Sequence, residues 1–278
     1  MLKVLGALLA AIVIAFIAFM QWRRADRHAD EAAWRELAVT KPATVNRFDP
    51  AMIAGLPDAA RRCLDFAIAP GTPLAPVVRL QMQGQLGLGD KTNPKYRSFQ
   101  ARQIIAFPHG FVWRLDAGAI GGSDGLLPTG SWTRFWLLGL VVRVASDDHH
   151  RRSAFGRLVA EAAFWAPASL LPGPHVRWEE AGRDTARAVV TYNDLDQAVE
   201  IEVAPDGQPR SVMIQRWSSE NADSTYRLQP FGGYLPEYRD FGGYRLPTRV
   251  EGGNHFGQDA YFPFFKAKIT EVDIGARE

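Results

Sequence analysis

Hydrophobic and polar residues alternate along several stretches of the chain. In residues 78–88, five apolar side chains alternate with Arg79 and three glutamines, and the same period of two recurs at 110–116, 199–203 and 265–270. Strands that bury one face show this pattern, whereas strands of a parallel sheet are apolar on both faces. The sequence therefore predicts a mainly antiparallel sheet and disfavours a parallel nucleotide-binding fold.

Glycine-containing turns connect two pairs of these strands. Asp206-Gly207 separates residues 199–203 from 211–217, and Gly242-Gly243 separates 238–241 from 244–250, so both regions predict hairpins. Pro247 has no N–H to donate, which predicts an edge position or a bulge in its strand. The similar Phe-Gly-Gly-Tyr at 231–234 is expected to be a loop that leads into the second hairpin. It is not followed by the Lys-Ser or Lys-Thr helix of a phosphate-binding loop.

Two further stretches predict helices. Pro57 and Asp58 are typical of a first helical turn, and Gly71 ends the short helix that follows them. A longer helix is expected from about Ser153 to Trp165, since apolar residues recur there at helical spacing and Pro167 follows. This helix has a broad apolar face, which the apolar face of the sheet can cover.

The first twenty residues are the most apolar part of the chain. No charged side chain occurs from Val4 to Met20, and at about 1.5 Å per residue this run and its flanks span a hydrocarbon core of roughly 30 Å. Trp22 and two arginines follow, as is typical where a helix leaves a membrane. A cleaved secretory signal is the alternative, but the residues around Met20 make a poor cleavage site. We therefore predict an uncleaved single-pass anchor at 1–24, a helical stalk and linker at 25–50, and one domain at 51–278.

Charge and cysteine content narrow the range of partners. The net charge of +2 is spread without a basic stripe, which argues against nucleic-acid binding. Cys63 is the only cysteine, so no internal disulfide indicates an oxidising compartment.

The orientation of the anchor in the membrane depends on the charges that flank it. Three arginines at 23, 24 and 27 compete with Lys3, and this charge bias alone would keep the body of the protein in the cytoplasm. The oligomeric state is not predicted.

The segment Asp147-Asp148-His149-His150 is the most obvious candidate for a metal site, because carboxylates and imidazoles ligate divalent cations. Adjacent side chains on a strand point to opposite faces, however, and two arginines follow the segment. We interpret it as a solvated loop and expect neither a metal nor another cofactor.

Glu161 lies on or beside the apolar stripe of the longer predicted helix, where an ionised carboxylate needs a partner. A structural ion pair with Arg216 is one interpretation, and a polar contact in a lipid-sized cavity is the other. The same alternatives, core filling or cavity lining, apply to five aromatic residues, and those at the end of the helix are expected to decide whether an apolar ligand binds. The five are Trp113, Phe135, Trp136, Phe164 and Trp165.

Taken together, several stretches resemble an uncharacterised bacterial family of membrane-anchored proteins that is similar in fold to the periplasmic lipoprotein carriers LolA and LolB. The resemblance covers most of the chain after about residue 45. Its main stretches are the anchor, the Gly-Leu-Pro helix start, GFVWRLD, AEAAFWAPASLLPG, the strand that begins at Trp178, DGQPRSVMIQRW and YRDFGGYRLPTRVEGG. The resemblance implies an α+β fold, in which an incomplete antiparallel β-barrel wraps around one or two helices with an apolar cavity between them. The anchor is unlike the soluble carrier and argues against free shuttling.

From these features we expect a non-enzymatic protein of the cell envelope that binds a lipid, another apolar ligand or a lipidated protein segment. The anchor would place it in the inner membrane, and the resemblance implies that its body is periplasmic, against the charge bias. The ligand-binding residues would be Trp113, Phe135, Trp136, Glu161, Phe164, Trp165 and Arg216. One alternative is a structural or sensor module whose own side chains fill the core. A second is a hydrolase that uses Glu161 or the Asp-Asp-His-His segment.

Overall fold

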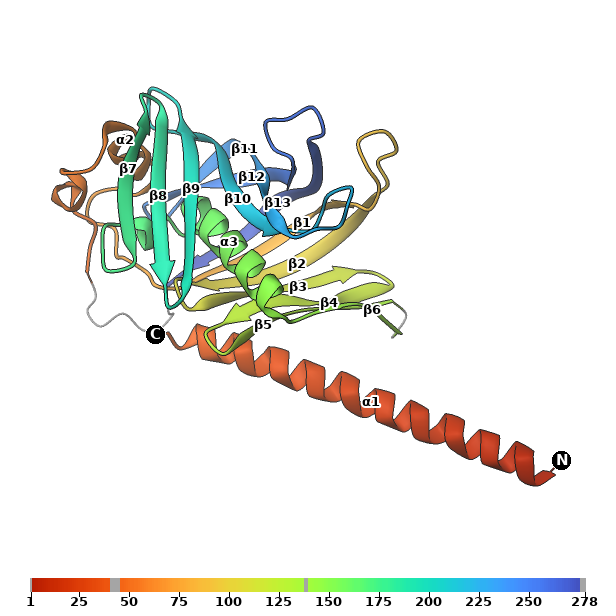
Figure 1. The fold of residues 1–278 in the computed structure, drawn as a ribbon. Coiled ribbons are helices and arrows are strands. Elements are labelled where there is room, and N and C mark those ends of the chain that lie inside the picture. The colour runs from red at the N-terminus through yellow and green to blue at the C-terminus, as the bar shows by residue number, and fades with distance from the viewer. Residues whose placement is uncertain (1, 41–45, 138–139, 276–278) are drawn as a thin grey trace.

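The chain folds as one long antiparallel sheet that curls around a helix (Figure 1). The computed structural model describes residues 2–40, 46–137 and 140–275. Its helices are α1 (Leu2–Ala38), α2 (Asp58–Ala67) and α3 (Asp148–Trp165), with short 3₁₀ turns at Pro50–Ile53 and Pro167–Leu170. Its strands are β1 (Val78–Gly87), β2 (Tyr96–Ala106), β3 (Gly110–Ala117), β4 (Ile120–Leu127), β5 (Gly130–Leu137), β6 (Leu140–Ala145), β7 (Val176–Gly182), β8 (Thr185–Tyr192), β9 (Leu195–Val203), β10 (Pro209–Ser218), β11 (Arg227–Phe241), β12 (Tyr244–Asn254) and β13 (Phe262–Ile274).

The strand order shows that the barrel is incomplete. Within the described residues, thirteen strands follow the order β6-β5-β4-β3-β2-β1-β13-β12-β11-β10-β9-β8-β7. Every neighbouring pair is antiparallel. β6 and β7 are the two ends of the order, so the sheet does not close, and β13 joins the two halves by pairing with β1 and β12. The predicted incomplete antiparallel barrel is therefore confirmed.

Both predicted hairpins are present. β9 and β10 are joined through Gly207, and β11 and β12 through Gly242 and Gly243, and all three glycines have positive φ. Pro247 lies in β12, between β11 and β13, so it is not at an edge. The register with β11 shifts beside its partner Tyr238, so the alternative expectation of a bulge is correct.

The Phe-Gly-Gly-Tyr segment at 231–234 is a strand, and the predicted loop is wrong. It belongs to β11, which pairs with β10 on one side and β12 on the other. A Cβ at Gly233 would lie 1.7 Å from the carbonyl oxygen of Glu251. These glycines therefore let the neighbouring strands approach closely within the sheet. Paired glycines are also typical of turns, so the sequence alone does not distinguish the two roles.

The helix α3 begins five residues before its predicted start at Ser153. Asp147 is its N-cap, since the side chain accepts a hydrogen bond of 2.7 Å from the backbone N–H of His150. Asp148 lies in the first turn, where a carboxylate favours the positive end of the helix dipole. The Asp-Asp-His-His segment is therefore the start of a helix, and its interpretation as a loop was wrong.

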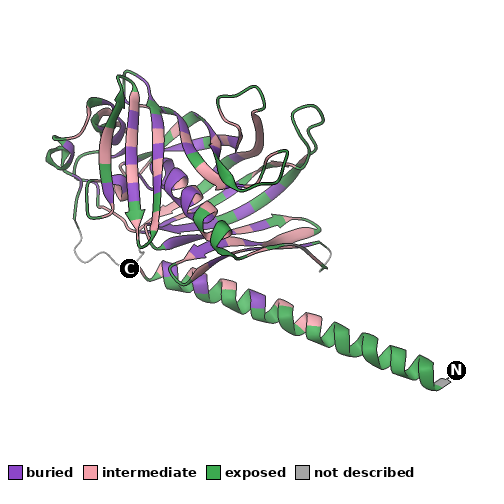
Figure 2. Ribbon diagram, in the orientation of Figure 1, coloured by how far each residue is buried: buried purple, intermediate pink, exposed green. Residues whose placement is uncertain are grey.

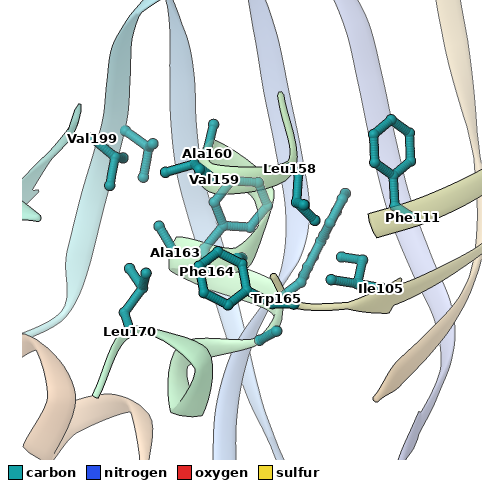
Figure 3. Packing of buried hydrophobic residues seen from close by; sticks show 14 of the residues in the cluster. Ile105, Phe111, Leu158, Val159, Ala160, Ala163, Phe164, Trp165, Leu170 and Val199 are labelled. Atoms are coloured by element: carbon teal, nitrogen blue, oxygen red, sulfur yellow. The ribbon is translucent and has the colours of Figure 1, made fainter. Parts of the chain in front are cut away.

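The helix α3 lies on the inner face of the curled sheet and fills much of its interior (Figures 1 and 2). Its apolar side chains are buried among residues of both halves of the sheet, as the close view in Figure 3 shows for Leu158, Trp165, Ile105 and Phe111. Trp165 is 1% exposed. This packing is the main core of the domain.

The helix α1 is continuous from the apolar window into the charged segment that follows. One helix in the described part of the chain is long and apolar enough to cross a membrane, and its apolar window has no buried residue. The second half of α1 packs on the outer face of β2 and β3, where Ala33 and Leu37 meet Ile104 and Val112. Residues 25–38 therefore lie against the sheet. The domain boundaries proposed at 24 and 50 stay predictions, and residues 41–45 of the predicted linker lie outside the described residues.

Candidate functional site

Four aromatic side chains form a continuous patch on the inner face of the sheet. Trp113 of β3 contacts Phe99 of β2, Phe135 of β5 and Phe265 of β13, with ring centroids 5.9, 6.2 and 6.3 Å apart. Phe99 and Phe265 stack at 5.6 Å. Trp113 and Phe99 are buried, but Phe135 and Phe265 are only half-buried. We call these four residues the inner aromatic patch.

The inner aromatic patch lies beside α3 rather than under its most tightly packed part. α3 packs chiefly against β9 and β10, at the other side of the curled sheet. The apolar residues around the patch are also half-buried: Leu86, Ala117, Ile120 and Phe231. The inner face therefore keeps an apolar region that the chain covers only in part. Of the predicted ligand-binding residues, the structure brings Trp113 and Phe135 together in this region.

Glu161 forms part of a charged network at the border of the patch. Its partner is Arg157, one helical turn earlier on α3, at 2.7 Å, and Gln103 of β2 donates a second hydrogen bond to it. Arg157 also donates a hydrogen bond of 2.6 Å to Asp124 of β4. The guanidinium carbon lies 5.2 Å from the ring centre of Trp113. The expected ion pair of Glu161 with Arg216 is therefore replaced by a pair with Arg157, a side chain four residues away on the same helix face.

The Asp124 carboxylate stays ionised inside the protein. Burial raises the pKa of Asp124, but hydrogen bonding and charge from His150, Arg157 and Thr133 outweigh it and lower the pKa to about 2. Burial disfavours the charged form of Arg157, but Glu161 and Asp124 outweigh this effect and raise its pKa. The network therefore consists of charges that are largely buried and mutually compensated.

His150 connects this network to β5. Its Nδ1 lies 2.8 Å from the Ser131 hydroxyl, and its Nε2 lies 2.8 Å from the Thr133 hydroxyl, which itself donates a bond of 2.7 Å to Asp124. Serine, histidine and aspartate are thus linked, but Ser131 is only 7% exposed. These hydrogen bonds hold the start of α3 against the sheet. The buried Ser131 hydroxyl is not positioned to act as a nucleophile on a substrate.

A Gly-x-Ser-x-Gly sequence at 121–125 also lies in this region. The pattern is typical of α/β-hydrolases when its serine sits at a turn from a strand into a helix. Here Ser123 is in the middle of the antiparallel strand β4, is 5% exposed, and its Oγ accepts a hydrogen bond of 3.0 Å from Trp132. The structural context that the motif requires is not met.

Arg216 of β10 lies at another border of the apolar region. Its Nε donates a hydrogen bond of 2.9 Å to the Ser153 hydroxyl, and its guanidinium carbon lies 4.8 Å from the centre of the Phe231 ring. Burial and the nearby charge of Arg157 lower the pKa of Arg216 to about 10. It therefore remains a cation at neutral pH.

Three predicted ligand-binding residues lie outside the inner aromatic patch and its border. Phe164 and Trp165 are core residues of α3, with rings 4.7 Å apart, and the Trp165 indole N–H points to the Pro247 carbonyl oxygen at 3.4 Å. Trp136 is on the outer face of β5, since adjacent residues of a strand point to opposite faces and Phe135 points inward. Its indole N–H donates a hydrogen bond of 3.1 Å to Asp26 of α1.

The described residues contain no group of three or more histidine, cysteine or acidic side chains that could hold a metal ion. In the Asp-Asp-His-His segment, His150 belongs to the network, whereas His149 stacks on Tyr226 at 4.2 Å and accepts a hydrogen bond from Trp217. The two histidines therefore face different partners.

Two grooves lie on the outer face of the sheet and are lined mostly by polar side chains. One of about 810 Å³ runs over β1, β13 and β12 beside Gln83, Arg249 and Lys268. The other, of about 320 Å³, lies between α1 and β3–β5, beside Arg27 and Trp136. Neither is the apolar cavity that the sequence predicted between sheet and helix.

The sequence pointed to Trp113, Phe135 and Glu161 but missed Phe99, Phe265, Asp124 and Arg157. Phe265 lies in the alternating run 265–270, so its inward orientation could be predicted. Arg157 is four residues before Glu161, a spacing that brings side chains together on a helix. The contribution of Asp124 depends on a strand whose glycine-rich sequence has no clear period.

Comparison with solved structures gives low overall similarity. A LolA superfamily protein from Nitrosomonas europaea shares 8% identity and a TM-score of 0.44, over 78% of this chain and 91% of that chain. A domain from Vibrio parahaemolyticus, provisionally described as an outer membrane lipoprotein-sorting protein, shares 11% identity and a TM-score of 0.36, over 71% and 85%. A DUF1329 family protein from Desulfovibrio piger shares 12% identity and a TM-score of 0.31, over 82% and 94%.

No curated protein sequence matches the chain. A family match covers residues 46–267, which include the whole sheet except the end of β13, together with α2 and α3. The chain therefore belongs to DUF6544, a family of unknown function.

Proposed function

We propose that this protein is a membrane-anchored, non-enzymatic binding protein whose inner aromatic patch holds an apolar ligand, such as the acyl chain of a lipid or of a lipidated protein segment. The observation that carries the proposal is the patch itself: four contiguous rings, two of them half-buried, on the concave face of an open barrel. An apolar chain laid on these rings would remove their remaining exposed surface from water.

The surroundings of the patch fit an amphipathic ligand. Arg216 and Arg157 lie at the border of the apolar region, and each guanidinium contacts an aromatic ring. Arg157 forms ion pairs with two carboxylates, whereas Arg216 donates a hydrogen bond to Ser153, lies over the Phe231 ring and feels the charges of Asp124, Glu161 and Glu220 from further away. Arg216 is therefore the better candidate to contact a polar or anionic head group.

The location completes the proposal. α1 would hold the protein in the inner membrane, since its apolar window is long enough to span one. The body would be periplasmic, where the lipoprotein carriers that the sequence resembles act. In this arrangement the protein would receive or hold an acyl chain close to the bilayer without leaving it.

Retention of lipid by the full chain tests the proposal. In native mass spectrometry of the chain released from nanodiscs, the parent should retain one tightly bound lipid. Phe135→Ala and Phe265→Ala should each weaken retention about tenfold, since each removes a large apolar contact worth roughly 1–2 kcal/mol.

Phe256→Ala is the matched control, because Phe256 belongs to a separate aromatic group with Tyr234 and Tyr261. Its retention should equal that of the parent. Equal retention by all four proteins, or none by the parent, would contradict the proposal and favour a module with a self-filled core.

A further inference from the structure

The smaller groove, between α1 and the sheet, lies just after the apolar window of α1. Its helical wall consists of Arg23, Asp26, Arg27 and Asp30, and spacings of three and four residues put these side chains on one helix face. The opposite wall belongs to β3, β4, the turn between them, and β5. Its volume of about 320 Å³ is at the lower end of the range for small-molecule sites, which suits a compact polar group. We call it the α1 pocket.

The position of the α1 pocket along the helix corresponds to the head-group layer of a bilayer. The uncharged run ends at Met20, and Arg23 and Arg27 follow it by about 5 and 10 Å along the helix axis. The head-group layer is roughly 5–8 Å thick on each side of the hydrocarbon core. Figure 2 shows that most of α1 before the pocket is exposed. If α1 crosses a membrane, Arg23 therefore lies within this layer and Arg27 at its outer edge.

Two cations of the α1 pocket are free to meet an anion. The Arg23 guanidinium lies over the Trp136 ring at 5.4 Å, and Arg27 is exposed. Among the described residues, neither guanidinium forms an ion pair, whereas the arginines of β3 and β5 pair with the two aspartates of α1. Two arginines one helical turn apart fit a phosphate group, because its oxygens accept several charge-assisted hydrogen bonds at once.

One carboxylate of the α1 pocket is incompletely paired. Asp30 Oδ2 lies 2.7 Å from Arg114, but Oδ1 is buried and forms no hydrogen bond within the described part of the chain. Burial raises the pKa of Asp30 more than Arg114 and the nearby Ser123 hydroxyl lower it. An N–H donor from a ligand would stabilise this oxygen, since a buried acceptor without a donor is unfavourable. Asp26 already has a partner on each oxygen.

A glycine keeps the floor of the α1 pocket open. Gly121 of β4 is directly opposite Trp136 of β5, so a side chain at 121 would point to the same outer face as the indole. A Cβ at this position would have only the Leu115 carbonyl oxygen near it, at 3.5 Å. A larger side chain at 121 can therefore be accommodated by the strand and would narrow the pocket.

We propose that the α1 pocket binds the head group of a phospholipid that carries a primary ammonium, such as phosphatidylethanolamine, with the phosphate on Arg23 and Arg27 and the ammonium on Asp30 Oδ1. A phosphate ester next to an ammonium complements two unpaired cations and one incompletely paired carboxylate. The source is the bilayer that α1 crosses, because the pocket lies at head-group depth. The bound lipid holds the body at a fixed depth and orientation. The inference rests on the membrane anchoring in the proposed function and not on ligand binding at the inner aromatic patch.

Site-specific photo-crosslinking tests this inference. The photoreactive residue p-benzoylphenylalanine replaces Ala119, an exposed residue that lines the α1 pocket, in the full chain. The protein is reconstituted in vesicles of equal parts phosphatidylethanolamine and phosphatidylcholine and irradiated, and mass spectrometry identifies the lipid attached to the peptide with residue 119. Phosphatidylethanolamine should be the main adduct, because the methylated ammonium of choline has no N–H to donate to Asp30.

Arg27→Gln should lower the yield of this adduct about tenfold, as expected for the loss of one charge-assisted hydrogen bond. Arg24→Gln is the matched control and should not change the yield, because Arg24 is exposed at a similar depth but does not line the pocket. Gly121→Val should also lower the yield, since it narrows the pocket without removing a charge. Gly182→Val is its control, at an exposed glycine of β7 where a Cβ also has room.

Equal adducts of the two lipids, or equal yields from the parent and Arg27→Gln, would overturn the inference. Loss of the lipid adduct in excess glycerophosphoethanolamine would also overturn it and assign the pocket to a soluble phosphate ester. Extraction of the parent by carbonate would contradict the anchoring and this inference with it. Phe135→Ala should leave the adduct unchanged, so failure of ligand binding at the inner aromatic patch is a separate result. Circular dichroism of each variant verifies that it is folded.

Discussion

Replacing Arg157 with methionine is expected to lower the free energy of unfolding by about 3–5 kcal/mol, because it leaves the carboxylates of Asp124 and Glu161 without their buried cation. Urea unfolding of the full chain in micelles, followed by near-UV circular dichroism, measures the change. Adding Glu161→Gln should recover part of the loss, since it removes one of the two uncompensated charges. Arg61→Met is the control and should cost less than about 1 kcal/mol, because the Arg61–Asp58 pair is exposed.

The pH dependence of this effect follows from Asp124. Its pKa is lowered to about 2 in the folded protein, against roughly 3.9 in an unfolded chain. A lowered pKa contributes stability that is present above pH 4 and is lost as the pH falls toward 2. Without Arg157, one of the charges that lower the pKa of Asp124 is lost, so this pKa rises. The difference in stability between parent and Arg157→Met should therefore be smaller at pH 3 than at pH 7, and a difference independent of pH would contradict the role given to the network.

Trp165→Ala should destabilise the domain by about 3–5 kcal/mol, since it removes the largest fully buried side chain and leaves a cavity in the core. Trp165→Phe keeps most of the packing and should cost less than about 1.5 kcal/mol. The same unfolding experiment measures both changes.

Lipid retention separates a role in packing from a role in binding. Trp165→Phe should retain lipid like the parent, because Trp165 is buried in the core, whereas Phe135→Ala should not. Altered retention in Trp165→Phe with normal stability would restore the expectation, drawn from the sequence, that the end of α3 decides binding.

Where burial is one-sided, the sequence predicted the sheet well. β1, β3, β9 and β13 alternate strictly enough to assign their inward faces, and the glycine turns located two hairpins. β4, with the sequence IGGSDGLL, could not be predicted, because its three glycines leave no period to recognise. The start of α3 was missed because Asp147, a common type of N-cap residue, was interpreted together with its charged neighbours as a solvated loop, and the helix from Ser153 already satisfied the apolar pattern.

The candidate site was predictable only in part, because its residues come from distant strands. Trp113 was recognised in an alternating, strand-like stretch and Phe135 only as a large aromatic residue, and which rings meet depends on the strand order. Trp136 shows the same limit: a shift of one residue along β5 places a side chain on the opposite face. The packing of α1 on the sheet could not be predicted either. In the sequence, Asp26 and Asp30 are typical of a solvent-exposed helix, and only the folded structure pairs them with Arg134 and Arg114.

The claim that the inner aromatic patch holds an acyl chain is tested most directly by photo-crosslinking. The full chain is reconstituted in nanodiscs with a phospholipid that carries a diazirine at the end of one acyl chain, irradiated, digested and mapped by mass spectrometry. The account predicts adducts on the β13 peptide that contains Phe265 and the β2 peptide that contains Phe99, in addition to those on α1. Adducts confined to α1 would contradict ligand binding at the patch.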